Sequence, residues 1–183
     1  VPINLYKDGR SRPPHLNRWR DAWRHTRFML LHSPKWLFII PGLVMIITGL
    51  FGELLLLPGT FTINRVNFDV HSLLVMSFLV IIGTQTAFTG IFAVIYGYTA
   101  GILPRSNKLE SLIKKLTLEK LLIACLALGS AGAGGFTYTI WQWYEVNFSS
   151  LDYQVTMRQL IPSLTVIAIA VQGGFNGCML SIL

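Results

Sequence analysis

The chain has 183 residues and a formal net charge of +7 at pH 7, yet only 13% of its residues are charged and 52% are hydrophobic. Soluble domains carry about 25% charged residues, and the mean hydropathy of this chain is positive, at +0.55. The composition therefore excludes an ordinary soluble enzyme or binding domain and predicts an integral membrane protein.

The N-terminal segment is polar, and Gly9, Pro13 and Pro14 interrupt regular structure there, so we expect a basic loop over residues 1–15. The chain starts with Val1 and reads like the end of a strand entering a loop. It shows no charged region followed by a short apolar region, which a signal peptide would have. We therefore expect this loop to be the end of a cytoplasmic domain that the chain does not contain.

Helical periodicity begins after the loop and predicts an amphipathic helix over residues 16–33. One stripe of this helix is apolar, and the stripe beside it is basic with the spacing i, i+4, i+7. The apolar stripe holds Leu16, Trp19, Trp23 and Leu30, and the basic stripe holds Arg20, Arg24 and Arg27. A helix with this pattern lies in the membrane interface, with its indoles at the acyl boundary and its guanidinium groups among phosphates.

Four apolar runs follow, over residues 36–57, 70–94, 121–141 and 160–183. Each is long enough to cross a bilayer core, which requires about 20 helical residues. Apolar residues at i, i+3, i+4 and i+7 predict a second amphipathic helix over residues 107–118, directly before the third span. The expected fold is an all-α integral membrane protein with four transmembrane helices and two amphipathic juxtamembrane helices.

The basic residues are distributed unequally between the two sides of the predicted membrane. Of the 15 Lys and Arg residues, all but Arg65 and Arg158 precede the first span or lie in residues 103–120. The positive-inside rule then places both termini and the middle loop in the cytoplasm. We expect a multi-pass protein with this orientation.

Small residues recur at helix-packing spacing in the second and third spans. They are Ala93, Gly97 and Gly101 in the second, and Ala127, Gly129, Ala131, Ala133 and Gly135 in the third. The stretch GSAGAGG at residues 129–135 also suggests a phosphate-binding loop. It lies within a span and has no Lys-Ser or Lys-Thr after it, so helix packing is the favoured interpretation.

No catalytic motif or metal-ligand spacing is present, so we predict no catalytic residue and no metal site in this chain. Glu53 is the one acid inside a predicted span, where carboxylates are functional candidates. It lies near the outer end of its span, so interfacial placement is favoured over a proton or ligand role. Gln85 and Gln172 are more central, and hydrogen bonding between helices is favoured for them over substrate binding.

The basic stretch from Tyr6 to Phe28 allows two interpretations. It is a juxtamembrane segment that fixes orientation and binds anionic lipid, to which each basic residue contributes about 1 kcal/mol. Alternatively, it binds a lipid-linked phosphate or diphosphate, because guanidinium groups suit bidentate phosphate contacts. Nucleic acid is disfavoured, because Trp19 and Trp23 lie on the stripe that leads into a span.

The segment DGRSRPPHLNRWRDAWRHTRFMLLHSPKWLFIIPG (Asp8–Gly42) closely resembles part of the bacterial polyprenyl-phosphate glycosyltransferases, the family-2 enzymes related to dolichol-phosphate mannose synthase. It resembles their junction between catalytic domain and membrane region. The other spans, with LTLEK before the third, follow the same pattern more generally. The resemblance extends over essentially the whole chain.

The resemblance implies a transferase that moves a sugar from a nucleotide donor to a polyprenyl phosphate in the bacterial inner membrane. It implies that membrane lipids and polyprenyl phosphate are partners, and other membrane proteins are further candidates. The lipid-phosphate binding residues that it implies are Arg10, Ser11, Arg12, His15, Arg20, Arg24 and Arg27. The nucleotide-sugar domain, with the acidic motif that binds Mg or Mn, has no counterpart here, so we expect no cofactor in this chain and no transfer by it alone.

Two other functions remain open. A non-catalytic transmembrane subunit of a larger membrane complex would use the small-residue stripes to contact partners. A lipid-carrier flippase would need a polar path through the bundle. Few residues are available for such a path, namely Gln85, Gln172, Asn176 and Glu53.

Overall fold

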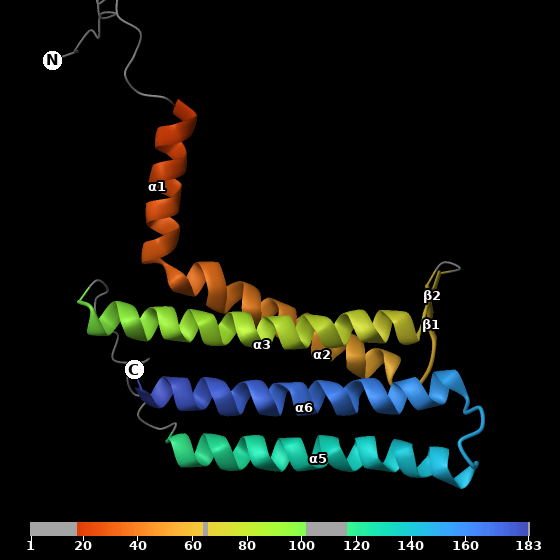
Figure 1. The fold of residues 1–183 in the computed structure, drawn as a ribbon. Coiled ribbons are helices and arrows are strands. Elements are labelled where there is room, and N and C mark those ends of the chain that lie inside the picture. The colour runs from red at the N-terminus through yellow and green to blue at the C-terminus, as the bar shows by residue number, and fades with distance from the viewer. Residues whose placement is uncertain (1–17, 64–65, 102–116, 183) are drawn as a thin grey trace, which may run out of the picture.

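A computed structural model describes residues 18–63, 66–101 and 117–182, and most of them are helical (Figure 1). The elements in chain order are α1 (Arg18–His32), the π-helical turn η1 (Lys35–Ile39), α2 (Ile40–Leu56), β1 (Phe61–Ile63), β2 (Val66–Phe68), α3 (Val70–Thr99), α5 (Leu118–Glu145) and α6 (Tyr153–Ile182).

Four described helices are long and apolar enough to cross a membrane, which confirms the prediction of four spans. The first span consists of η1 and α2 together and has 22 residues. The other three spans, α3, α5 and α6, have 28 to 30 residues each. The last three extend beyond the predicted apolar runs; α6, for example, begins at Tyr153. A helix of 30 residues is about 45 Å long, so these spans are longer than a hydrocarbon core of about 30 Å and must tilt or project from it.

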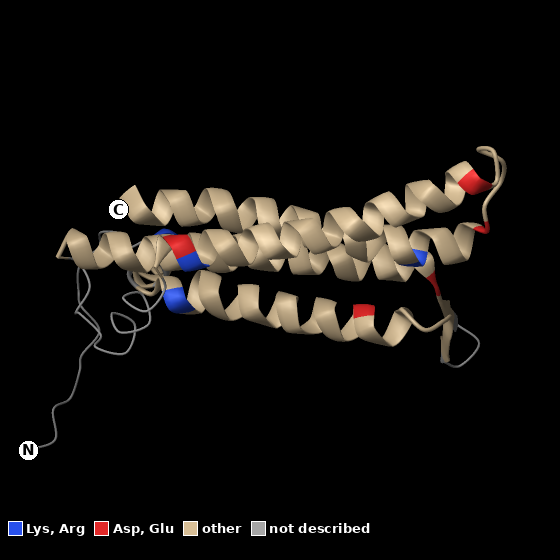
Figure 2. Cartoon of the chain, turned by 90° about the horizontal axis from the view of Figure 1, so that it is seen from below, with Lys and Arg blue, Asp and Glu red and all other residues tan. Residues whose placement is uncertain are grey.

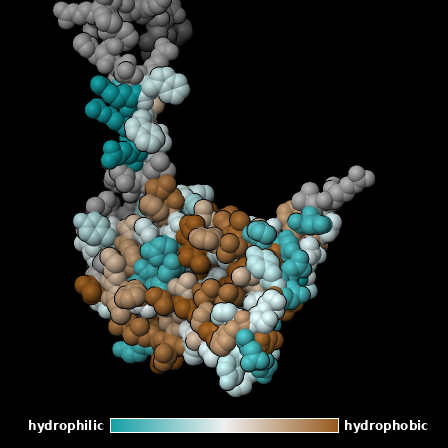
Figure 3. Space-filling view, turned by 45° about the vertical axis from the view of Figure 1, so that its right-hand side comes forward, coloured by the Kyte–Doolittle hydropathy of each residue, from teal (hydrophilic) through white to brown (hydrophobic). Residues whose placement is uncertain are grey.

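The spans are arranged as a row rather than as a closed bundle. The main contacts run from α2 to α3, from α3 to α6 and from α6 to α5 (Figure 1). In chain direction α3 and α6 both run from the hairpin end of the molecule to the end where the C-terminus lies. Much of the apolar surface stays exposed, as the brown areas of Figure 3 show. Lipid or other transmembrane helices must therefore cover this surface, because so large an apolar area is unfavourable in water.

Glycines bring α2 and α3 into backbone contact. A Cβ atom on Gly83 would lie 2.7 Å from the carbonyl oxygen of Gly42, and one on Gly49 would lie 2.7 Å from that of Met76. Gly90 packs in the same way against the main chain at Ile39. This contact was not predicted from the sequence. The available signal was the seven-residue spacing in both helices, between Gly42 and Gly49 and between Gly83 and Gly90.

The pair α5 and α6 also packs through small residues, on one face of α5. Cβ atoms on Gly129 and Gly132 would lie 3.4 Å from the Ala170 side chain and 2.9 Å from the Ser163 carbonyl oxygen, respectively, and Gly135 faces the Ser163 side chain. The structure places the other predicted packing residues of this span on its exposed surface; these are Ala127, Ala131 and Ala133.

In α3 the three predicted packing residues have different surroundings. Gly97 is buried and Ala93 is half-buried. Gly101 follows the end of the helix with a φ of +69°, and nothing lies within 4 Å of the position of its Cβ. A glycine at this conformation ends a helix at low cost, so the structure gives Gly101 a different role from helix packing.

Two features at the ends of the first span were not predicted. The polar excursion after α2 contains a two-stranded antiparallel hairpin in which Phe61 pairs with Phe68. At the other end, α1 stops at His32 and the π-helical turn η1 begins after Pro34. Figure 1 shows α1 running across the direction of the four spans.

The prediction of two amphipathic helices is tested only as far as the described residues extend. A helix does cover residues 18–32, within the predicted range 16–33, and its position at a membrane surface stays a prediction. The predicted basic loop over residues 1–15 and the predicted helix over residues 107–118 lie outside the described residues, apart from Thr117 and Leu118.

Candidate functional site

The predicted lipid-phosphate site centres on one face of α1, which we call the Arg stripe: Arg20, Arg24 and Arg27. All three side chains are exposed, as are those of Trp19 and Trp23. Figure 3 shows α1 projecting from the apolar bundle with hydrophilic residues along it. The helix therefore offers three cationic groups beside two exposed indoles, at the end of the molecule where the first span begins.

The other predicted site residues precede α1. Arg10, Ser11, Arg12 and His15 all lie outside the described residues. The structure thus describes the helical half of the predicted site and leaves the loop half a prediction. Lys35 begins η1 with an exposed side chain and adds a further cation near the start of the first span.

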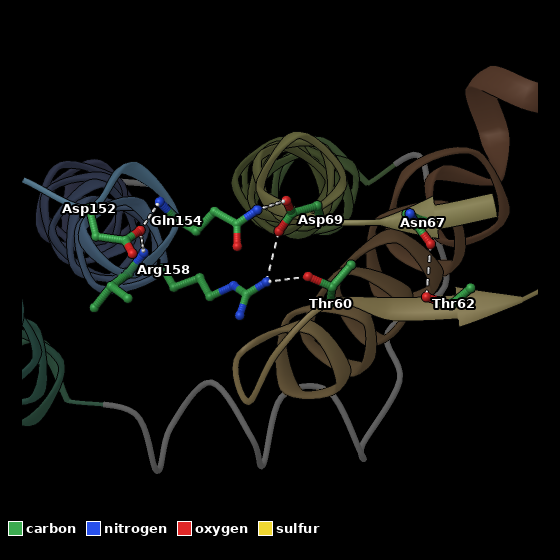
Figure 4. A network of polar contacts seen from close by, with 8 residues as sticks. Thr60, Thr62, Asn67, Asp69, Asp152, Gln154 and Arg158 are labelled. Atoms are coloured by element: carbon green, nitrogen blue, oxygen red, sulfur yellow. Dashed lines mark hydrogen bonds and ion pairs between the residues drawn. The ribbon is translucent and has the colours of Figure 1, made fainter. Parts of the chain in front are cut away.

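A second polar cluster lies at the hairpin end, and we call it the Asp69–Arg158 network (Figure 4). Arg158 Nη2 donates to Asp69 Oδ1 at 2.7 Å and to Thr60 Oγ1 at 3.0 Å. Gln154 Nε2 donates to Asp69 Oδ2 at 2.8 Å. The network joins α6 to the start of α3 and to the residue before the hairpin. The sequence shows Arg158 only as one of two basic residues on its side of the membrane, and its pairing with Asp69 was not predicted.

The hydrogen bond from Arg158 is the main cause that lowers the pKa of Asp69 below its ordinary value of 3.8. The Val70 main-chain N–H also lowers this pKa, and partial desolvation opposes the change. Because the pKa is lower in the folded than in the unfolded chain, the pair stabilises the fold above about pH 4. That stabilisation is lost as the pH falls through the lowered pKa.

We therefore expect Asp69→Asn to remove part of the acid sensitivity of the fold. The melting temperature of the unmodified protein should exceed that of the variant at pH 7, and the difference should shrink as the pH falls below about 4. Thermal unfolding in detergent from pH 7 to pH 3 measures this. A difference that stays constant over that range would contradict the account of Asp69.

Polar side chains within the spans pair between helices. Ser77 Oγ donates to Glu53 Oε1, and Asn176 Nδ2 donates to Gln85 Oε1 at 3.2 Å. Glu53 lies near the end of α2, and its side chain is buried against α3. Its interfacial depth in the membrane stays a prediction. The expected role of Gln85 in hydrogen bonding between helices is confirmed. Gln172 Oε1 is buried without a partner among the described residues.

Among the described residues, no group of three or more His, Cys, Asp or Glu side chains could hold a metal ion. Cys125 is half-buried, Cys178 is exposed, and both are free thiols. The described part of the chain therefore offers cationic and amide groups for binding, and its buried hydroxyl–carboxylate pair, Ser77 with Glu53, joins α3 to α2.

The long spans and the basic helix before them define a membrane-anchored region. The family description "Glycosyltransferase family 2 C-terminal transmembrane region" matches residues 91–183, and the chain belongs to this family. It is also 26% identical over 145 residues to the "Low-salt glycan biosynthesis hexosyltransferase Agl6" of Haloferax volcanii. That match covers 76% of this chain and 33% of the relative, so the chain spans about a third of the length of this curated relative. No solved structure matches the chain.

Proposed function

We propose that the chain is the membrane region of a glycosyltransferase that moves a sugar from a nucleotide donor to a polyprenyl phosphate. In this proposal the chain anchors the enzyme and holds the lipid phosphate at the membrane surface. The Arg stripe carries the proposal, because it is exposed on a helix that runs across the direction of the spans.

The geometry suits a lipid whose phosphate lies at the membrane surface and whose chain lies in the hydrocarbon. A helix that lies along the surface places guanidinium groups at the depth of the phosphates, while its indoles face the acyl boundary. Guanidinium groups bind phosphate with two parallel hydrogen bonds. Holding the acceptor in place lowers the entropic cost of the reaction, since only the donor then has to be positioned.

The proposal includes the loop before α1, where Arg10, Ser11, Arg12 and His15 would complete the phosphate site. A nucleotide-sugar domain would supply the donor site and a divalent metal, Mg or Mn. The membrane would be the bacterial inner membrane with both termini in the cytoplasm. The distribution of Lys and Arg supports this orientation, and Figure 2 shows most of the described Lys and Arg at the end of the molecule opposite the hairpin.

The binding step can be tested with two lipids that differ only in the phosphate. The natural protein in nanodiscs should bind a polyprenyl phosphate much more tightly than the uncharged polyprenol of equal length, and competition against a labelled polyprenyl phosphate measures the ratio. Equal competition by the two lipids would mean that the protein does not recognise the phosphate, and this result would contradict the proposed site.

A second candidate function is that of a non-catalytic subunit in a membrane complex. It is favoured by the exposed small residues of α5, among them Ala127 and Ala131, which another helix could approach closely. This function predicts that mild-detergent purification yields a stable assembly with other membrane proteins and no transfer activity.

A further inference from the structure

The side chain of Gln85 lies halfway along α3 and is exposed. Its Oε1 atom accepts a hydrogen bond from Asn176 Nδ2 at 3.2 Å. Its Nε2 group has no acceptor among the described residues, because the bond with Asn176 uses only the Gln85 oxygen. The middle of a 30-residue span lies near the centre of the bilayer, so this amide donor faces hydrocarbon in a single copy of the chain.

A donor exposed to hydrocarbon is costly, because acyl chains cannot accept a hydrogen bond and no water is present at that depth. Such groups are normally covered by another helix or by a polar ligand. A prenyl or acyl chain cannot satisfy the amide, since it has no hydrogen-bonding atoms. The exposed Gln85 donor therefore indicates a polar partner within the membrane.

Gln85 belongs to a stripe of exposed residues on α3, which we call the Gln85 face: Phe78, Ile82, Gln85, Thr89 and Tyr96. These residues follow the spacing i, i+4, i+7, i+11 and i+18, so they share one side of the helix. The glycines that contact α2 lie on a different side of α3. The α2 contact therefore leaves the Gln85 face exposed, and among the described residues α6 borders it through Asn176; another helix could pack along about five turns of α3.

We propose that a second copy of this chain packs on the Gln85 face and that the Gln85 amides of the two copies hydrogen-bond to each other. Two copies inserted in the same direction are related by a two-fold axis along the membrane normal, so residues at equal depth meet. A carboxamide has both a donor and an acceptor, and its oxygen has a second lone pair beyond the one that Asn176 uses. Gln85 is therefore complementary to itself.

Cysteine cross-linking of the natural protein in its membrane tests this interface while keeping Gln85 in place. Cys125 and Cys178 are first replaced by Ala. Single cysteines then replace Ile82 or Thr89 on the Gln85 face, or, as controls, Ile47 on α2 or Leu126 on α5, both of which are also exposed. We expect disulfide-linked dimers of the chain at positions 82 and 89 and little at the controls.

Two results would overturn the proposal. One is cross-linking at Ile47 or Leu126 that equals or exceeds that at the Gln85 face. The other is a product at positions 82 and 89 that joins the chain to a different protein, or no product at all. A different protein would show that the face has another occupant.

The role of the amide is tested by the dimer dissociation constant in lipid vesicles, measured by energy transfer between labelled copies. Gln85→Leu should raise this constant about three- to twentyfold, the range expected for interhelical hydrogen bonds in membranes, and Gln85→Asn should raise it less. Asn176→Ala is the matched control, because it removes the bond to Gln85 within one copy and leaves the Gln85 amide in place. An unchanged constant for Gln85→Leu, or an equal loss for Asn176→Ala, would contradict the amide pair.

Discussion

Replacing Arg20, Arg24 and Arg27 together by Gln should weaken the binding of polyprenyl phosphate about 100-fold. Each basic residue near an anionic surface contributes about 1 kcal/mol, and about 1.4 kcal/mol corresponds to a factor of ten in affinity. The three side chains are exposed on one face of α1, so their removal should not disturb the packing of the spans. Competition with labelled polyprenyl phosphate in nanodiscs measures the change.

Two comparisons make this experiment specific. Replacing the same three residues by Lys keeps the charge but loses the bidentate geometry, so the loss should be smaller than with Gln. An anionic phospholipid serves as the second ligand. If the Arg stripe only attracts anionic lipid in general, the Gln variant will lose affinity equally for both lipids. Unchanged binding of polyprenyl phosphate by the Gln variant would exclude the Arg stripe as its site.

Gly83→Leu should strongly destabilise the membrane fold, by about 3 kcal/mol or more. A Cβ atom at this position would lie 2.7 Å from the Gly42 carbonyl oxygen and 2.9 Å from the Ile46 main-chain nitrogen. Neither backbone atom can move without separating α2 from α3. Overpacking of this kind typically costs 1–3 kcal/mol and more when backbone must move. Thermal unfolding in detergent measures the loss.

Gly134→Leu is a matched control for this substitution. Gly134 also lies inside a span, but nothing lies within 4 Å of the position of its Cβ. Leucine there should be tolerated, and its better helix propensity should compensate for any loss. If Gly83→Leu and Gly134→Leu unfold at the same temperature, the close contact between α2 and α3 does not stabilise the protein as described.

The four spans could be predicted because length and hydropathy alone determine whether a helix can cross a bilayer. Their ends could not, because a helix can continue beyond the hydrocarbon: α6 begins at Tyr153, and its first turns include the polar residues Gln154 and Thr156 ahead of the predicted run. The Asp69–Arg158 network was hidden for a related reason. Asp69 and Arg158 lie 89 residues apart, and only the parallel arrangement of α3 and α6 brings them together.

The packing faces were harder to predict than the spans. Transmembrane helices are apolar all round, so hydrophobic periodicity does not show which side faces a neighbour. In α5 small residues occur on several sides, and the structure buries Gly132 while leaving Ala131 and Ala133 exposed. In α2 and α3 the spacing of Gly42, Gly49, Gly83 and Gly90 carried the information. The helix α1 and its Arg stripe could be predicted because the basic residues recur with the helical period.

The most direct test of the proposed function is sugar transfer by the natural protein in membranes. Membranes that contain it should move a radiolabelled hexose from a nucleotide donor into organic-extractable lipid, and added polyprenyl phosphate should increase this label. Membranes with the Arg20, Arg24 and Arg27 to Gln variant should transfer much less. If lipid-linked label is no higher than in membranes without the protein across a panel of nucleotide sugars, the glycosyltransferase account is contradicted, and the complex-subunit alternative gains support.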